Sequence, residues 1–184
     1  MKQTIMKQNL NRLCVLLLLC VFTSCLYSQT KLVSSRYQLE RVSIGKDADK
    51  KERYVYHLIY DYHAFQKQIS DKHLERMSGD CPVFLSRDAE KTFGKSILSV
   101  LNRELSNEEK ERLAKNKHWI FVEMSIDGNG KLLFVELLSS GWMMEEVIDV
   151  KHISNILHQV KRIPINNIRP FQENGYIRYT VVRR

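Results

Sequence analysis

Residues 119–141 read WIFVEMSIDGNGKLLFVELLSSG. Two apolar runs flank the segment Asp-Gly-Asn-Gly at 127–130, and Asn-Gly between strand-like runs favours a tight hairpin turn, because both residues tolerate positive φ. In both runs apolar residues recur at every second position, which predicts strands. The residues that alternate in this way are Ile120, Val122, Met124, Ile126, Leu133, Val135 and Leu137. The opposite face is mixed, with Glu123 and Glu136, so we expect a sheet that is buried on one face and partly covered on the other.

A helix that could cover this sheet follows in the chain. Apolar residues lie at spacings of three and four, and they form one stripe of a helix: Ile153, Ile156, Leu157, Val160 and Ile163. Asp149 is a suitable N-cap, and Pro164 cannot continue a helix, so the helix is expected to end near Ile163. Asn174-Gly175 then marks a turn, and residues 176–182 alternate again as a strand. The predicted order is strand, strand, helix, strand.

This order resembles the C-terminal domain of TonB-type energy transducers. The motifs that carry the resemblance are a strand ending in Asp127 with a Gly-Asn-Gly-Lys turn at 128–131, and a second strand running into Ser-Ser-Gly at 139–141. They continue with the amphipathic helix, the following Pro164, and a final strand at 176–182. The resemblance implies an antiparallel sheet whose edge accepts an extended peptide from an outer-membrane receptor, and it covers about residues 119–182.

Two further helices are expected before this unit. From Ser86 to Leu105 the apolar residues again form one stripe: Phe93, Ile97, Val100, Leu101 and Leu105. Ser106 followed by Glu109 matches a capping box, which predicts a short helix over 107–115. The 86–105 helix is too apolar on one side to stand free, so we expect it to pack on the same sheet. The fold class predicted is therefore α+β, with an antiparallel sheet covered by amphipathic helices in one domain over 30–184, made of an N-terminal part (30–117) and a TonB-C-like part (118–184).

The N-terminal part contains two more strand-like segments. Residues 37–44 and 53–62 are rich in β-branched and aromatic residues, and the charged segment 46–53 separates them. They are expected to form a hairpin that either pairs with the C-terminal sheet or stands beside it. The second segment carries an aromatic face made of Tyr54, Tyr56, Leu58 and Tyr60. Such a face can bind a sugar or a peptide, but packing under a helix is the favoured interpretation.

Two groups of residues could carry chemistry in the N-terminal part. On a strand, His57, Asp61 and His63 would share one face and could hold a metal ion, with His73 as a further ligand, although solvent-facing polar residues explain the same pattern. Cys81 is the one cysteine left in the folded part, but no histidine forms a recognisable catalytic signature with it. We therefore expect no metal site, no cofactor and no catalytic residue.

The first residues resemble an export signal. Lys2, Lys7 and Arg12 precede a ten-residue apolar run at 13–22, which is too short to span a membrane and is typical of a cleaved signal peptide. Two processing sites compete. Removal of 1–24 would leave Cys25 to be lipidated, as in a lipoprotein, whereas removal of 1–28 would leave a soluble periplasmic protein starting at Gln29.

Removing the signal also lowers the net charge. The whole chain carries +8, and residues 1–29 contain three basic and no acidic residues, so 26 basic and 21 acidic residues remain, for a net charge of +5. No basic stripe with interleaved aromatic residues is present, so a nucleic-acid partner is not expected. P-loop, dinucleotide-binding, nucleophile-elbow and HExxH motifs are also absent from the sequence.

The sequence therefore predicts an exported envelope protein with a protein- or peptide-binding module. A structural envelope lipoprotein and a small exported hydrolase are the alternatives. Binding is expected by strand addition at the last strand, because that strand ends the chain. The candidate edge residues are Tyr176, Arg178, Tyr179, Thr180 and Val182. Contact with the membrane is expected only through a lipid on Cys25, and the sequence does not indicate an oligomeric state.

Overall fold

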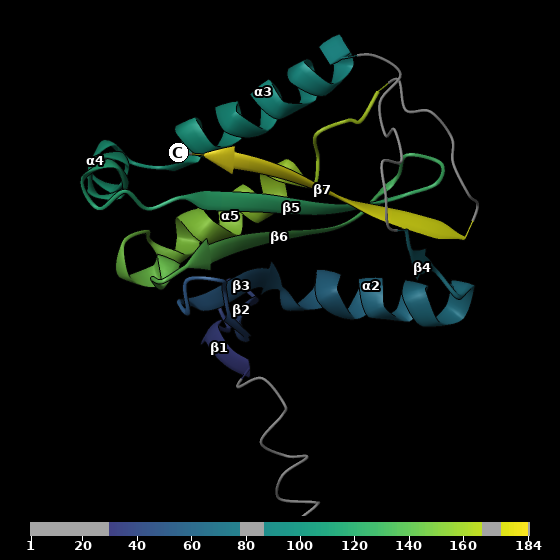
Figure 1. Cartoon of the computed structure of the whole chain (residues 1–184), viewed down its shortest axis with the longest axis horizontal. Coiled ribbons are helices and arrows are strands. Elements are labelled where there is room, and N and C mark those ends of the chain that lie inside the picture. The colour runs from purple at the N-terminus through teal and green to yellow at the C-terminus, as the bar shows by residue number, and fades with distance from the viewer. Residues whose placement is uncertain (1–29, 78–86, 167–173, 184) are drawn as a thin grey trace, which may run out of the picture.

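The computed structural model describes residues 30–77, 87–166 and 174–183, and within them it contains one seven-stranded sheet (Figure 1). The strands lie in the order β1-β2-β3-β6-β5-β7-β4, and all neighbours are antiparallel except β4 and β7. The strands are β1 (Thr30–Ser34), β2 (Leu39–Lys46), β3 (Glu52–Leu58), β4 (Glu75–Arg76), β5 (Ile120–Asp127), β6 (Leu132–Ser140) and β7 (Gly175–Arg183). The helices are α2 (Ile59–Lys72), α3 (Arg87–Glu104), α4 (Asn107–Lys115) and α5 (Val150–Val160), with a 3-10 turn η1 (Met144–Glu146). The predicted α+β class is confirmed.

The β5–β6 hairpin forms at the predicted turn. The Asp127 carboxylate accepts hydrogen bonds from the backbone N–H groups of Asn129 and Lys131, at 3.0 and 2.8 Å. Gly130 adopts φ +83°, a conformation that residues with a side chain rarely adopt. The hairpin is thus fixed by the aspartate side chain and by one glycine, and it sets the register in which Glu123 lies opposite Glu136.

The N-terminal hairpin joins this sheet directly. Strands β2 and β3 pair with each other, and β3 pairs with β6 from Arg53–Ser140 to Tyr56–Leu137. The predicted strand over 53–62 was too long, because β3 ends at Leu58 and α2 begins at Ile59. Helical spacing places three side chains of α2 against the sheet: Tyr62, Phe65 and Ile69. Burial of this stripe outweighs the strand preference of the tyrosines, and Tyr60 is left 73% exposed. The aromatic face expected on one strand is therefore split between a strand and a helix.

Strands β1 and β4 were not predicted. Strand β1 pairs with β2 at one end of the sheet, and the two residues of β4 lie beside the start of β7 at the other end. Both strands are short, and they lack the alternation of apolar and polar residues that is found in the longer strands. Their formation therefore depends on pairing with the neighbouring strand.

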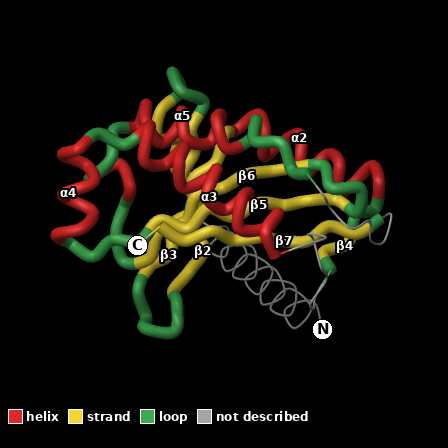
Figure 2. Tube along the Cα trace, turned by 90° about the horizontal axis from the view of Figure 1, so that it is seen from above, coloured by secondary structure: helices red, strands yellow, loops and turns green. Residues whose placement is uncertain are grey.

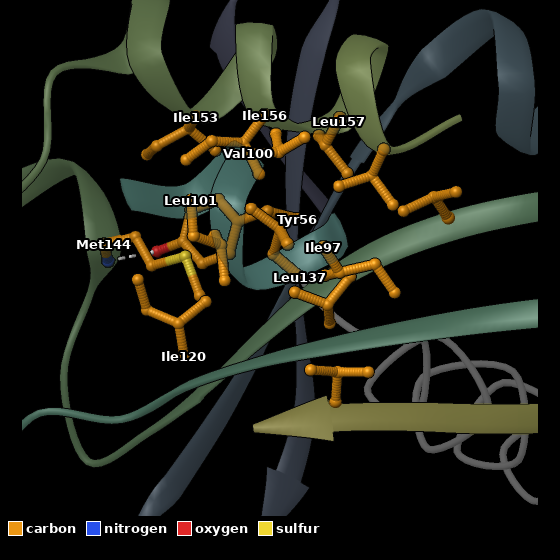
Figure 3. Packing of buried hydrophobic residues seen from close by; sticks show 14 of the residues in the cluster. Tyr56, Ile97, Val100, Leu101, Ile120, Leu137, Met144, Ile153, Ile156 and Leu157 are labelled. Carbon is orange, nitrogen blue, oxygen red and sulfur yellow. Dashed lines mark hydrogen bonds between the residues drawn. The ribbon is translucent and has the colours of Figure 1, made fainter. Parts of the chain in front are cut away.

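Helices cover the two faces of the sheet unequally. Helices α3 and α5 pack on one face, and α2 packs on the other. Figure 1 shows α3 above the strands and α2 below them, and Figure 2 gives the view of these helices from above. The predicted stripes of α3 and α5 meet the even-numbered apolar residues of β5 in one core, part of which Figure 3 shows. Members of this core that are almost fully buried include Ile97, Leu101, Ile120, Leu137, Ile153 and Ile156. We call the α2 side the second face.

A buried tyrosine ties the 3-10 turn to the sheet. The Tyr56 hydroxyl accepts a hydrogen bond from the backbone N–H of Met144 at 2.8 Å (Figure 3) and donates one to the Glu145 carboxylate. Arg41 forms an ion pair with the same carboxylate. Burial, together with the Glu145 charge, raises the pKa of the Tyr56 hydroxyl, so it stays protonated and keeps donating. The segment after β6 is thereby held against β3.

Glu109 connects two helix starts. Its carboxylate accepts from the backbone N–H of Ser106, which completes the predicted capping box of α4, and from the backbone N–H of Asp149, the N-cap of α5. It also lies 2.9 Å from Nδ1 of His152. The Glu109 residue is 2% exposed. Hydrogen bonds from these three groups outweigh the effect of burial and lower the pKa of Glu109, so it is ionised at neutral pH.

We predict that Glu109→Ala destabilises the fold by about 2–3 kcal/mol, because it removes a cap and leaves buried backbone donors unpaired. The measurement is urea unfolding followed by circular dichroism. Glu108→Ala is the matched control, since Glu108 is exposed in the first turn of the same helix and is expected to contribute well under 1 kcal/mol. Equal effects of the two substitutions would contradict the bridging role of Glu109.

Candidate functional site

Strand β7 has one long side without a neighbouring strand among the described residues. Its other side pairs with β5 in eight consecutive residue pairs and without a register shift, from Tyr176–Asp127 to Arg183–Ile120. On the outer side, β4 pairs only with Gly175 and Tyr176. Beyond Tyr176, the described chain therefore has a regular strand edge that could accept another strand.

The backbone direction along this edge follows from one hydrogen bond. The N–H of Met77 donates to the carbonyl of Tyr176 at 2.9 Å, so the backbone groups of Tyr176 point outward, away from β5. Because backbone groups alternate along a strand, those of Arg178, Thr180 and Val182 also point outward. Within the described ranges no backbone hydrogen bond is found for these three residues on that side. They offer donors and acceptors at the spacing that a β-strand needs.

The structure divides the five predicted edge residues into two groups. Arg178, Thr180 and Val182 carry the outward backbone groups and exposed side chains on the second face. Tyr176 is buried and covered by β4, and Phe65 lies against its ring. Tyr179 points its backbone toward β5, and its ring lies 5.8 Å from that of Phe93. The sequence of β7 does not show which of these residues belong to which group, because the division depends on where β4 pairs with β7. The lipidation candidate Cys25 lies outside the described residues.

The two ends of the sheet differ in regularity. At the β1 end, a register shift between Leu32 and Ser34 interrupts the pairing with β2. Bulges and short strands are common ways of preventing unwanted pairing at an edge. Strand β7 has nine residues and a continuous register. Of the two ends, the β7 end is thus the one suited to strand addition.

Helix α3 limits the direction of approach to this edge. Figure 1 shows α3 running alongside β7, and Phe93 of α3 contacts the core face of that strand. An added strand would therefore have α3 on its core side and would present its other side chains next to Arg178, Thr180 and Val182.

A group of charged side chains lies on the second face beside this edge. Glu123 of β5 is directly opposite Glu136 of β6, and Arg178 of β7 forms an ion pair with Glu123 and lies 3.5 Å from Glu136. Glu136 is only 8% exposed. Burial and the neighbouring Glu123 raise the pKa of Glu136 to about 7, although Arg178 and Arg76 act in the opposite direction. This carboxyl group therefore changes charge near neutral pH.

The charged group continues across the sheet to β3 and β2. His57 is on the same face as Glu136, because Tyr56 pairs with Leu137 in the neighbouring register position. Its Nε2 lies 3.1 Å from Glu40, its ring stacks on Tyr62, and its buried Nδ1 has no hydrogen-bond partner among the described residues. Burial lowers the pKa of His57, so the ring is neutral at pH 7. We call Glu40, His57, Glu136, Glu123 and Arg178 the polar row.

The polar row could be found only in part from the sequence. Glu123 and Glu136 stand out as acidic residues on otherwise apolar strands, but their opposition and the position of His57 depend on non-local pairing. Its carboxylate and imidazole groups could in principle exchange protons. The solvent-shielded Nδ1 of His57 makes direct contact with a substrate unfavourable, because a general base needs hydrogen-bond reach to the proton that it removes.

The residues weighed for metal binding do not converge. The hypothesis needed a strand that carried His57, Asp61 and His63 on one face, but Asp61 and His63 lie in α2. Asp61 pairs with Lys161, and His57 faces Glu40. Within the described part of the chain, no group of three or more His, Cys, Asp or Glu side chains could hold a metal ion. Cys81 lies outside the described residues. In that part of the chain, moreover, no helix combines the length and apolar character needed to cross a bilayer.

Comparison with known proteins gives a likeness of fold alone. No family model matches the chain, and no curated protein matches it. Its structure is similar to the crystal structure of a DUF5043 family protein from Bacteroides uniformis, with a TM-score of 0.51 and 10% sequence identity. The alignment covers 85% of this chain and 90% of that chain. The resemblance to TonB-type C-terminal domains stays a prediction from the sequence.

We predict that Glu136 makes the free energy of unfolding decrease as pH rises from about 4.5 to about 7. The pKa of Glu136 is raised in the folded state, so between the two pKa values the folded protein keeps a proton that the unfolded chain has lost. The stability that this proton contributes is fully present below the pKa of the unfolded chain, and it is lost as pH rises through the pKa of the folded protein. The size is on the order of 3–4 kcal/mol, because the pKa rises from 4.5 to about 7 and each pKa unit corresponds to about 1.4 kcal/mol. Urea unfolding across this range should show the decrease in the wild type and a flatter profile in Glu136→Gln.

The comparison between the two proteins isolates Glu136. His57 changes the free energy of unfolding in the opposite direction, because a group with a lowered pKa in the folded state reduces stability as pH falls. His57 is present in both the wild type and Glu136→Gln, so its contribution cancels when their free energies of unfolding are subtracted. Glu111→Gln, at an exposed position of α4, is the control and should keep the wild-type profile. A pH-independent difference between the wild type and Glu136→Gln would contradict the assignment.

Proposed function

We propose that this chain is an exported envelope protein that binds an extended peptide by adding it as a strand to the outer edge of β7, without catalysing a reaction. The observation that carries the proposal is the regular edge from Arg178 to Val182, where alternate backbone groups point away from β5. In strand addition, backbone hydrogen bonds supply affinity, and side-chain pockets beside the added strand supply specificity.

Side chains near the edge indicate what the peptide should carry. On the second face, Val182 is 37% exposed and lies opposite Phe121, and Trp119 is 44% exposed with its ring 6.5 Å from that of Phe121. An apolar residue of an added strand beside Val182 would cover this surface. Adjacent strands lie about 4.8 Å apart, which brings such side chains into contact. The proposed partner is thus an extended segment with an apolar residue at that position.

Export is the second element of the proposal, and it is supported by the amino-terminal sequence. Lys2, Lys7 and Arg12 precede the apolar run at 13–22, a pattern typical of secretory signals. We infer a location in the periplasm, or on the periplasmic side of the outer membrane if Cys25 is lipidated. An envelope location would place the β7 edge among other envelope proteins.

We predict that a peptide selected from a random library against this protein protects the amides of Arg178, Thr180 and Val182 from hydrogen exchange. In the free protein these three amides should exchange faster than those of Ile177, Tyr179 and Val181, which point toward β5. Thr180→Pro should abolish binding, because it removes an outward donor but no hydrogen bond to β5. The measurements are residue-resolved hydrogen exchange by NMR and peptide binding by calorimetry.

Thr180→Ala is the matched control, since it keeps the backbone N–H and should retain binding within a few fold. Thermal unfolding establishes that the proline variant is folded. Equal binding by the two variants would contradict strand addition, as would slow exchange of the three outward amides in the free protein. A library that yields no binder would also contradict the proposal.

We predict that intact-mass spectrometry of the native protein detects processing near residues 24–29. A mass that shows a diacylglycerol group on Cys25 identifies the tethered form, and a lipid-free mass starting near Gln29 identifies the soluble periplasmic form. Membrane and periplasmic fractions are measured separately so that each form serves as the control for the other. A native chain that starts at Met1 would contradict export by a cleaved signal.

A further inference from the structure

The Arg178 side chain lies beside the outer edge of β7 with part of its guanidinium group unused. Both of its carboxylate contacts, to Glu123 and to Glu136, are made by the Nη1 atom. Among the described residues, no hydrogen bond or ion pair of its Nε and Nη2 atoms is found. A guanidinium group carries five N–H donors in a planar arrangement, so it can bind more than one carboxylate. The side chain is 33% exposed, and a ligand at the edge can therefore reach the unused donors.

A second arginine lies on the same face at the start of this edge. Arg76 of β4 pairs with Tyr176 of β7, and the Tyr176 ring packs on Phe65 of α2, so the Arg76 side chain is also on the second face. Arg76 is exposed, and no ion pair of this residue is found within the described ranges. The second face beside the edge thus carries two guanidinium groups.

The negative charge that balances these two arginines changes near neutral pH. Glu123 forms an ion pair with Arg178, whereas Glu136 gains and loses a proton, because burial raises the pKa of its carboxyl group to about 7. With Glu136 protonated, two guanidinium groups face one carboxylate. The second face beside the edge then has one excess positive charge, which suits an acidic side chain.

Other titratable groups near Glu136 lie on β3, β2 and α2. His57 of β3 is on the same face, and burial lowers its pKa, so its ring is neutral at pH 7. Its Nε2 faces Glu40 of β2. Tyr62 of α2 stacks on the His57 ring, and the charge of His63 on the same helix also lowers the pKa of His57. None of these groups is found in contact with Arg178 among the described residues, so the charge beside the edge depends on the two arginines and the two glutamates.

We propose that a peptide added to the β7 edge places an acidic side chain beside Arg178, and that Glu136 takes up a proton from solvent as this ion pair forms. The proposal rests on the proposed strand addition and names one side chain of the ligand. Adjacent strands lie about 4.8 Å apart, so the second-face residue of the added strand opposite Arg178 brings its carboxylate within reach of Nε and Nη2. Because β4 pairs with the same side of β7 two residues earlier, Arg76 is next to that carboxylate.

Arg178 connects peptide binding with the protonation of Glu136. An incoming carboxylate attracts the guanidinium group toward the outer edge and adds a negative charge, and both effects favour the protonated form of Glu136. A peptide with a neutral residue at this position does neither, so its binding should leave the protonation of Glu136 unchanged. Proton uptake on binding means, by linkage, that an acidic peptide binds more tightly as pH falls from 8.0 to 6.5.

The test uses a peptide that is selected from a random library for binding to the β7 edge, is blocked at both ends, and carries glutamate or glutamine at each second-face position in turn. At one position the glutamate peptide should bind about fivefold more tightly than the glutamine peptide at pH 6.5. The Kd of that glutamate peptide should rise by up to about eightfold between pH 6.5 and 8.0, as expected for one proton on a group with a pKa of about 7. Calorimetry at pH 7.5 in buffers of different ionisation enthalpy should detect up to about 0.8 proton taken up per peptide. The glutamine peptide should show neither effect.

Two variants separate the parts of the proposal. Glu136→Gln should lose the pH dependence and the proton uptake but keep the preference for glutamate, and Arg178→Gln should bind the two peptides equally. Arg36→Gln is the matched control, because it removes an exposed arginine between β1 and β2, at the other end of the sheet, and should leave both results unchanged.

The possible failures can be told apart. Peptide binding at the β7 edge without a preference for glutamate at any second-face position would overturn this inference and leave strand addition intact. A preference for glutamate with neither pH dependence nor proton uptake would overturn the coupling to Glu136. The absence of any peptide binding would overturn both this inference and the proposed function.

Discussion

The pairing of β3 with β6 is the constraint on which the rest of the structure depends. It joins the N-terminal hairpin to the C-terminal strand-strand-helix-strand unit and makes β6 an inner strand. Seven of the nine residues of β6 are buried, because helices cover it on both faces. The seven buried side chains of this strand, Glu136 among them, must then fit an interior. The burial of this carboxyl group and its raised pKa are consequences of that pairing.

A buried acid of this kind has an energetic cost that an apolar residue would avoid. Desolvation disfavours the charged form of Glu136, and the adjacent Glu123 adds repulsion, whereas the single Arg178 contacts both carboxylates. The arrangement is therefore less costly when Glu136 is protonated. Because Arg178 also belongs to β7, the charge state of the polar row acts on the strand whose outer side, beyond Tyr176, has no neighbouring strand among the described residues. Packing of the core and the electrostatics of the edge are in this way connected through one side chain.

Local signals predicted most of the fold, and non-local pairing decided the rest. Alternation gave β5, β6 and β7, Asp127 and Gly130 fixed the hairpin, and the capping box at Ser106 gave α4. The boundary at Leu58 was missed because tyrosines favour strands locally, while the stripe of α2 gains burial only once Phe134 is in place. The outward residues of β7 could not be separated from Tyr176 and Tyr179, since that division depends on β4 and α3.

Backbone hydrogen bonds alone would make the β7 edge a weak binding site. Each is worth about 0.5–1.5 kcal/mol net, and the peptide loses about 1–2 kcal/mol of conformational freedom for each ordered residue. Affinity must then come from side chains on the added strand, and the surface beside Val182 and Phe121 is the apolar area within reach. Burying it supplies about 25 cal/mol per Å². Selectivity for a peptide at this edge would thus depend on one apolar side chain of the peptide beside Val182 and on the acidic one beside Arg178, and the backbone hydrogen bonds would set only the register of the added strand.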